Sequence, residues 1–293
     1  MSGEGAAENR TWQHCVIVGA GLLGASIAGA GKARGLFARV TGVGRSRANL
    51  ETARARGFVD DITSDLAAAC NGADLVILAT PVRTAVAQLA SVAAATDASC
   101  AITDVGSVKG AIVAEACRLG LHERFVGAHP VAGKAETGAG AADVDLLRGA
   151  WVVLTPDDTT PPRLRQRMRG LWQELGARVL EMPAAQHDEV LASSSHLPQM
   201  VAYVLAAAAG ASPLRKQVTQ LAASGFRDTT RLAASDPDMW ADIARLNREA
   251  LLCAMDRFGV LWAKLRKAVD DGDEETLRSL IDDARDMRNE VVP

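Results

Sequence analysis

Three glycines spaced as Gly-x-Gly-x-x-Gly, between a short apolar run and a helical segment, constrain this chain more than any other feature. The apolar run covers residues 15–18, and the glycines follow it directly. In a strand–turn–helix unit the first glycine permits a tight turn, the second lets the backbone approach a pyrophosphate, and the third allows close helix–strand packing. The phosphate charge then faces the helix N-terminus. The motif predicts a dinucleotide-binding turn made of Gly19, Gly21, Leu22, Leu23 and Gly24.

Short β-branched runs alternate with helical segments through the first half of the chain. The runs lie at residues 15–18, 39–43, 75–78, 101–103, 125–127, 151–155 and 178–182. Continuous apolar strands separated by helices are typical of a mostly parallel sheet that is covered on both faces. We therefore predict an α/β fold that begins with a Rossmann-type, doubly wound domain over residues 1–183.

Beyond Pro183 the sequence shows no convincing strand pattern. Helical segments are expected at residues 187–209, 213–223, 238–269 and 273–289. Alanine-rich helices with few aromatic residues need a partner to bury their apolar faces. Residues 184–293 are therefore predicted to form an all-helical domain that completes the substrate site and joins two copies into a homodimer.

Composition and charge argue against several kinds of partner. The net charge of -3 gives no basic field for nucleic acid. The five cysteines are scattered and never spaced as metal ligands, so we expect reduced thiols and no metal. Residues 1–14 are polar and unlike a signal peptide, and the longest apolar stretch, residues 200–209, is far shorter than the roughly 20 residues that cross a bilayer. We expect a cytoplasmic protein without a membrane partner.

The end of the second predicted strand selects between NAD and NADP. In this type of fold an acid there bonds the ribose 2′-hydroxyl, whereas an arginine accommodates a 2′-phosphate. Here the segment carries Arg45, Ser46 and Arg47, and no acid. A 2′-phosphate could pair with both guanidinium groups and accept a hydrogen bond from the serine. The segment favours NADP over NAD. If the arginines are only solvated charges, NAD could bind without the acid.

Polar residues follow three later strands, at the edge where an open parallel sheet binds its ligand. Thr80 and Pro81 are assigned to the cofactor. His129 is the best candidate for a general base, because an imidazole titrates near neutral pH and this one is expected in a loop directly after a strand. Ser107 could hydrogen-bond it. The alternative is that His129 only caps a turn before Pro130.

Five motifs, in order along the chain, resemble the prephenate/arogenate dehydrogenase family. They are GAGLLGAS at residues 19–26, DVGSVK at 104–109, HPVAG at 129–133, SHLP at 195–198 and GFRDTTR at 225–231. The resemblance implies a Rossmann domain followed by a helical dimerisation domain. It also implies oxidative decarboxylation of prephenate or arogenate, to 4-hydroxyphenylpyruvate or tyrosine, with hydride transfer to NAD(P)+ in tyrosine biosynthesis.

The resemblance assigns roles to single residues. His129 matches the family's catalytic histidine, which takes the substrate's hydroxyl proton, and Ser107 matches a serine that bonds both this histidine and the nicotinamide region. Arg231 matches the arginine that binds a substrate carboxylate, for which its guanidinium offers a bidentate fork. Asp188 matches an acid that would hold this arginine by an ion pair. Lys109 is expected to be solvated or to add positive charge over the substrate.

His196 and Gln199 are expected near a helix start that faces the cleft, where Pro198 fits the first turn. Some relatives carry histidine at the position of Gln199, close to the substrate side chain. A neutral amide can donate to a keto acid or accept from an amino acid, so we expect either substrate or both. The alternative for His196 is a hydrogen bond to a buried backbone carbonyl.

Two other functions fit part of the pattern. A β-hydroxyacid-type NAD(P)-dependent dehydrogenase would share the glycine motif and the domain order. It would be expected to use a lysine on its central helix as acid and base, where this chain offers His129. A non-catalytic NADP-binding sensor would keep the motif without bringing Ser107, His129 and Arg231 together. The β-hydroxyacid-type alternative does not require decarboxylation coupled to cofactor reduction. A sensor would keep its function in the His129→Ala variant, whereas an enzyme that uses His129 as its base would not.

Overall fold

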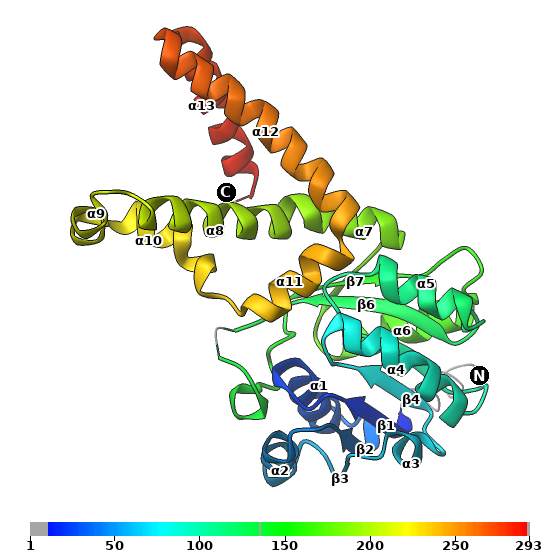
Figure 1. Ribbon diagram of the computed structural model, residues 1–293. Helices are drawn as coiled ribbons and strands as arrows, with labels where there is room; N and C mark the ends of the chain where they lie inside the picture. The colour runs from blue at the N-terminus through cyan, green and yellow to red at the C-terminus, as the bar shows by residue number, and fades with distance from the viewer. Residues whose placement is uncertain (1–10, 135, 292–293) are drawn as a thin grey trace. The chain divides into compact units, whose positions relative to one another are not determined.

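A computed structural model describes residues 11–134 and 136–291 of the chain (Figure 1). Most of the polar N-terminal stretch that underlies the predicted cytoplasmic location lies outside the described residues. The chain divides into two compact units, Met1–Val190 with Ser235–Asn247, and Leu191–Ala234 with Arg248–Pro293. Most of helix α7 (Ala184–Leu191) and all of α11 (Pro237–Leu246) therefore belong to the first unit. The domain boundary after residue 183 stays a prediction.

The first unit is built on an eight-stranded sheet with the order β3-β2-β1-β4-β5-β6-β7-β8. All neighbouring strands are parallel except β6 and β7. The strands are β1 (Trp12–Val18), β2 (Phe37–Val43), β3 (Asp61–Thr63), β4 (Leu75–Leu78), β5 (Ala101–Asp104), β6 (Phe125–Val131), β7 (Trp151–Thr155) and β8 (Arg178–Glu181). The chain winds outward in both directions from β1, which places a topological switch point between β1 and β4. The predicted Rossmann-type, mostly parallel fold is confirmed.

Helices cover both faces of this sheet and bury two apolar clusters. Ile17 of β1 lies in one cluster, whereas its neighbours Val16 and Val18 lie in the other, because successive strand side chains point to opposite faces. This explains the continuous apolar strands in the sequence. Helices α1 (Leu22–Ala33), α2 (Arg47–Ala55) and α6 (Pro162–Glu174) contribute to the first cluster, and α3 (Leu66–Cys70), α4 (Val82–Ala95) and α5 (Gly110–Arg118) to the second.

Strand β6 continues past its predicted end at residue 127, so the expectation that His129 lies in a loop after the strand was wrong. His129 is inside β6 and is paired with Val153 of the antiparallel strand β7. Pro130 also lies in this strand, although a proline cannot donate to a ladder. On its other side, however, β6 pairs with β5 only at Phe125 and Val126, and proline is tolerated where a strand has such an edge.

The second unit consists of helices. A π-helical turn, Ala192–His196, leads into α8 (Leu197–Gly210), and a 3-10 turn, Arg231–Ala234, follows α10 (Ser224–Thr230). The remaining helices are α9 (Arg215–Leu221), α12 (Arg248–Asp271) and α13 (Glu274–Val291). The single helix predicted at residues 238–269 is two helices, α11 and α12, because the chain leaves helical geometry at Asn247. Within the described ranges, no helix combines the length and apolarity needed to span a bilayer.

Candidate active site

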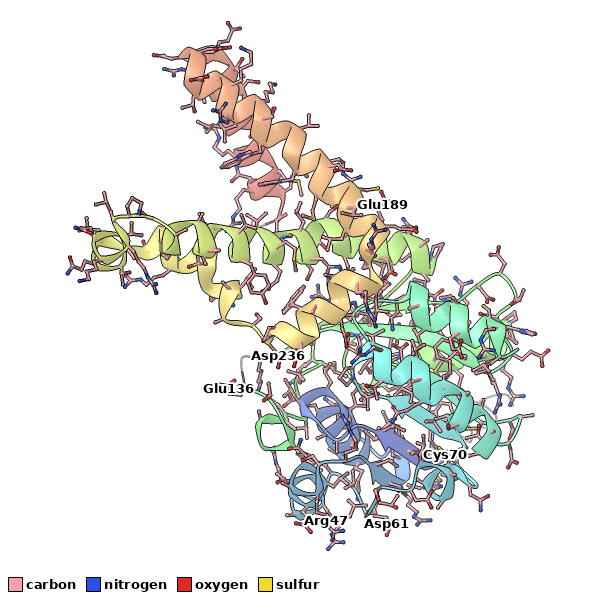
Figure 2. The ribbon with its side chains drawn as sticks, viewed as in Figure 1. Arg47, Asp61, Cys70, Glu136, Glu189 and Asp236 are labelled. Carbon is pink, nitrogen blue, oxygen red and sulfur yellow. The ribbon has the colours of Figure 1, made fainter. Side chains whose placement is uncertain are left out.

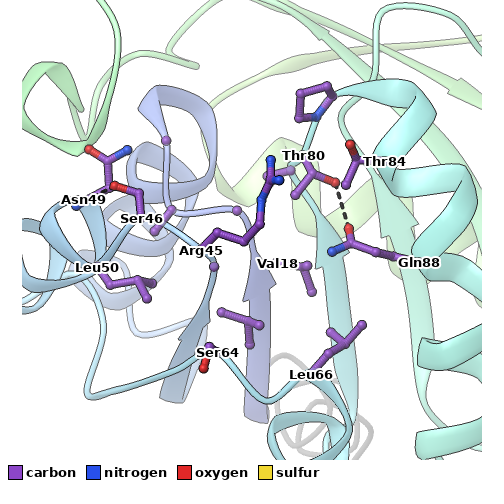
Figure 3. A pocket seen from close by; sticks show the side chains of 17 residues that line it. Val18, Arg45, Ser46, Asn49, Leu50, Ser64, Leu66, Thr80, Thr84 and Gln88 are labelled. Carbon is purple, nitrogen blue, oxygen red and sulfur yellow. Dashed lines mark hydrogen bonds between the residues drawn. The ribbon is translucent and has the colours of Figure 1, made fainter.

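A cavity of about 560 Å³ lies at the carboxyl ends of β1, β2 and β4 (Figure 3). Much of its lining comes from three segments, residues 18–21 at the end of β1, 43–46 at the end of β2 and 79–81 after β4. These segments meet at the switch point of the sheet, where an open α/β fold binds its ligand. The cavity is therefore the candidate cofactor site, and it brings together Gly19 and Gly21 of the glycine motif with Arg45, Ser46, Thr80 and Pro81.

The glycines of the motif meet three different environments. Gly19 has a φ of 103°, and a Cβ there would lie 2.6 Å from the carbonyl oxygen of Ala79. A Cβ on Gly24 would lie 2.0 Å from the carbonyl oxygen of Gly19. Around Gly21, in contrast, a Cβ would meet no atom within 4 Å. The turn is closely packed at its two ends and open at the glycine where the pyrophosphate is predicted to approach, beside Leu22 and Leu23 in the first turn of α1.

The three residues after β2 have different surroundings. Arg45 lines the cavity and, with Ser46, is seen in the close view of Figure 3. The Ser46 hydroxyl caps α2 by accepting a 3.3 Å hydrogen bond from the backbone N–H of Asn49. Arg47 lines a smaller neighbouring pocket and donates from Nε to Oε1 of Glu51 over 2.7 Å. Figure 2 shows its side chain at the outer surface of the first unit. Arg45 is thus the better placed of the two arginines.

Thr80 and Pro81 form the wall of the cavity between β4 and α4. The Thr80 hydroxyl donates to Oε1 of Gln88 over 2.9 Å, which Figure 3 shows as a dashed line. Pro81 precedes the first residue of α4. Gln88 and Thr84 also line the cavity, from α4. The sequence analysis did not select these two residues, because one helical glutamine or threonine carries no motif.

His129 belongs to a buried chain of three polar side chains. Its Nδ1 lies 2.8 Å from Nε2 of His187, and Nδ1 of His187 lies 2.7 Å from Oδ1 of Asp188. The two rings meet edge to face, with their planes at 73°. His129 comes from β6, and the other two come from α7. The sequence analysis did not select His187, because its contact with His129 joins residues that are far apart along the chain.

The carboxylate of Asp188 also caps helix α5. Its Oδ1 accepts from the backbone N–H of Lys109, and its Oδ2 from that of Gly110, each over 2.8 Å. A carboxylate at a helix N-terminus is stabilised by the free N–H groups and by the helix dipole. The loop just before α5 carries Ser107, which is half-buried. The predicted hydrogen bond of Ser107 to His129 and the predicted ion pair of Asp188 with Arg231 stay predictions.

Lys109 does not occupy the solvated position expected for it. Its side chain is fully buried and pairs with the carboxylate of Asp104, which is fully buried too. Its ammonium also donates to the carbonyl oxygen of Ala128 over 2.8 Å. Burial lowers the pKa of Lys109, although the attraction of Asp104 acts in the opposite direction. Lys109 therefore supports the strand that carries His129, and its charge is already paired within the protein.

The other predicted site residues lie in the second unit. His196 ends the π-helical turn and is buried. Gln199, in the first turns of α8, is buried as well, and its Nε2 donates to the carbonyl oxygen of Leu232 over 2.6 Å. Arg231 opens the 3-10 turn that contains Leu232, and it is exposed. Gln199 is thus tied to the backbone beside Arg231, and their substrate-binding roles stay predictions.

A doubly wound sheet with a glycine-rich turn at its switch point defines the dinucleotide-binding class of proteins. The chain belongs to the prephenate dehydrogenase family. The model of that family's nucleotide-binding domain matches residues 27–181, and the model of its dimerization domain matches residues 183–283. The protein is an NAD(P)-dependent dehydrogenase.

Individual relatives agree with this assignment. The chain is 36% identical to a cyclohexadienyl dehydrogenase of Zymomonas mobilis, over 89% of this chain and 91% of the relative. It is 34% identical to a prephenate dehydrogenase of Bacillus subtilis, over 94% and 75%. Among solved structures, it resembles a prephenate dehydrogenase from A. aeolicus in complex with hydroxyphenyl propionate and NAD+, with a TM-score of 0.90, 30% identity, and coverage of 95% and 98%.

Proposed function

We propose that the protein oxidatively decarboxylates prephenate, arogenate or both, and reduces NAD(P)+ in tyrosine biosynthesis. A dinucleotide held in the cavity lined by Gly19, Gly21 and Arg45 would supply the acceptor for the hydride from the hydroxyl-bearing ring carbon. The bond to the ring carboxylate breaks, carbon dioxide leaves, and the ring becomes aromatic. The substrate's 4-hydroxyl must lose a proton in this reaction, and a positioned imidazole is the usual side chain for that task. The observation that carries the proposal is the buried His129, held through His187 by Asp188.

Substrate binding is assigned to residues of the second unit and to Ser107. Prephenate carries two carboxylates, for which fixed cations are needed. The Arg231 guanidinium is the proposed partner of one of them, through a bidentate pair of hydrogen bonds. Gln199 and His196 are the proposed neighbours of the substrate side chain, and Ser107 of the 4-hydroxyl. Because the Gln199 amide can both donate and accept, it could bind the side chain of either substrate, and we expect one substrate or both to be used.

The test is an absorbance assay at 340 nm that crosses prephenate and arogenate with NAD and NADP. Cofactor reduction with at least one substrate is expected. His129→Asn should lose about 100-fold or more of kcat while cofactor affinity is unchanged, since general acid–base catalysis contributes about 10²–10⁴-fold. Arg231→Ala should chiefly raise KM. No reduction in any of the four mixtures would overturn the proposed function, and normal turnover by both variants would overturn the site.

For the cofactor we infer a preference for NADP. The support is that the cavity is lined by Arg45 and that no acid follows β2. Arg45→Ala should weaken NADP binding about tenfold or more while NAD binding changes little, because a charge-assisted hydrogen bond contributes about 1.5–3 kcal/mol. Arg47→Ala is the matched control, since the guanidinium of Arg47 already pairs with Glu51. Tighter binding of NAD than of NADP by the unaltered protein would contradict the inference.

For the assembly we infer a homodimer formed through the second unit. The matching family model is described as a dimerization domain. Within the described residues, α12 and α13 expose large apolar side chains, which include Met255, Phe258, Leu261, Trp262 and Ile281. Surfaces of this kind are usual where a partner binds. Light scattering after gel filtration should give twice the chain mass, and Trp262→Lys with Phe258→Glu should give the monomer. The cytoplasm remains the predicted location.

A further inference from the structure

We propose that His187 and Asp188 fix the tautomer and the orientation of His129, so that the lone pair of His129 lies on Nε2. The pair would act as positioning residues, since neither is proposed to touch the substrate. This inference rests on the proposed function of His129 as the base. It begins from two hydrogen bonds, between Nδ1 of His129 and Nε2 of His187, and between Nδ1 of His187 and Asp188.

The chemistry of the three groups determines the direction of both hydrogen bonds. An ionised carboxylate only accepts, so Nδ1 of His187 must be the donor to Asp188. A neutral imidazole that carries its proton on Nδ1 has an acceptor at Nε2. With His187 in this neutral form, Nδ1 of His129 is the donor to His187. In its neutral form His129 then has no proton on Nε2, which is the protonation state that a base requires.

The anchor of this chain is Asp188, which is held through its carboxylate by the start of α5 and through its backbone carbonyl by Asn247. Its two oxygens accept from the backbone of Lys109 and Gly110 at the start of α5. Its carbonyl oxygen accepts from Nδ2 of the buried Asn247 over 2.8 Å. These contacts fix the backbone and the side chain of Asp188 together. The orientation of the His187 ring is therefore set by α5 and by residue 247 as well as by its own helix.

The same loop also holds the strand that carries His129. Lys109 donates from its ammonium to the carbonyl oxygen of Ala128, and Asp104 accepts from the N–H of Ala128 over 3.1 Å. The side chains of Asp104 and Lys109 thus hold the backbone beside His129. The backbone N–H groups of Lys109 and Gly110 bind Asp188, the anchor of the histidine chain. The segment from Asp104 to Gly110 therefore links the strand that carries His129 to the carboxylate of Asp188, and Ser107 lies within it.

A pair of variants tests whether the acceptor at position 187 matters. His187→Gln places an amide oxygen near the position of Nε2 and can still accept from His129. His187→Phe keeps a ring of similar size and removes the acceptor. We expect His187→Phe to lower kcat by about 10–100-fold, less than the loss in His129→Asn, because only the positioning of the base is lost. KM and cofactor affinity should stay within about twofold, and His187→Gln should recover most of kcat.

Histidine-selective ¹⁵N NMR supplies a readout that does not depend on activity. The chain has five histidines, so their ring signals can be assigned by single replacement. At a pH where His129 is neutral, the unaltered protein should show His129 with its proton on Nδ1, and His187→Phe should show a mixture of tautomers. His14→Gln is the control variant, since His14 lies on β1 and bonds Thr41. It should change neither kcat nor the His129 signal.

The outcomes separate this inference from the proposed function. If no substrate is turned over but His129 carries its proton on Nδ1, the proposed function fails and the positioning geometry stands. If the enzyme is active and His129 carries its proton on Nε2, or if His187→Phe keeps the full kcat, the positioning role is wrong. Should His187→Phe fail to fold, the tautomer of His129 in the unaltered protein and the kcat of His187→Gln still test whether His187 positions His129.

Discussion

Lys109 donates a hydrogen bond of 2.8 Å from its ammonium to the carbonyl oxygen of Ala128, the residue before His129. The N–H of Ala128 donates in turn to Asp104, which is also the ion-pair partner of Lys109. Strand β6 has lost its backbone ladder to β5 at this point, because that ladder ends at Val126. The buried side chains of Lys109 and Asp104 therefore bond the backbone carbonyl and N–H of Ala128, which elsewhere in the sheet are bonded by the backbone of a neighbouring strand.

Lys109→Met should destabilise the protein by about 3–5 kcal/mol, because it leaves the Asp104 carboxylate buried without its partner. Lys134→Met is the matched control. Lys134 pairs with Asp143 over 2.8 Å, but the two side chains are 38% and 39% exposed, and such a pair contributes about 1 kcal/mol or less. Urea unfolding of the three proteins gives the comparison. Equal midpoints for the two variants would show that the buried pair does not support the fold as argued.

The parts of the fold predicted well from sequence are those set by local chemistry. The strands at residues 75–78 and 151–155 have the predicted bounds, since continuous apolar runs bury both faces. The glycine turn was predictable because its backbone geometry excludes most other residues. Strand β3 was missed, because it has only three residues and Asp61 at its start is exposed.

The parts missed at the site depend on contacts between distant segments. The end of β6 is set by its pairing with β7, which no local pattern reports. His187 and His129 are 58 residues apart and meet only when α7 packs beside the sheet. The burial of Lys109 likewise depends on Asp104 and Ala128. A histidine followed by an acid, as in His187 and Asp188, was the one local signal of a tautomer-fixing pair.

Gly21→Ala should leave the fold intact and weaken cofactor binding about tenfold or more. A Cβ at this position meets no atom of the protein within 4 Å, so the added methyl group would displace only a bound pyrophosphate. Isothermal titration with NAD and NADP measures the loss, and thermal unfolding checks the stability.

Gly24→Ala is the contrasting variant, with the same added methyl group. Its Cβ would lie 2.0 Å from the carbonyl oxygen of Gly19, so the helix must move, at a cost of about 1–3 kcal/mol in stability. For the first variant, Gly21→Ala, an unchanged affinity for the cofactor would show that this turn does not contact the pyrophosphate.

Cys15, Cys70 and Cys100 should resist a thiol reagent while the protein is folded. Burial raises the pKa of Cys70 to about 11 and that of Cys100 to about 12, and it also raises the pKa of Cys15. Because the thiolate is the reactive form, little of it is present at pH 8. Mass spectrometry after alkylation, with and without urea, locates the modified residues. Rapid alkylation of any of these three cysteines in the folded protein would contradict their burial beside the sheet.

His14 should make the protein less stable below neutral pH. Burial lowers its pKa from the usual 6.5, and Arg39 lowers it further, so the unfolded chain takes up this proton before the folded one. Stability should therefore fall as the pH drops below about 6.5 toward the folded pKa, and should be independent of this group above that range. His14→Gln keeps a donor for the hydroxyl oxygen of Thr41, which lies 2.9 Å from Nε2 of His14, and removes the titration. Urea unfolding of both proteins at pH 7.5 and 5.5 makes the test, because all other titrating groups are shared and cancel. The unaltered protein should lose more stability between the two pH values than the variant does, and an equal or smaller loss would show that His14 is protonated as easily in the folded state as in the unfolded chain.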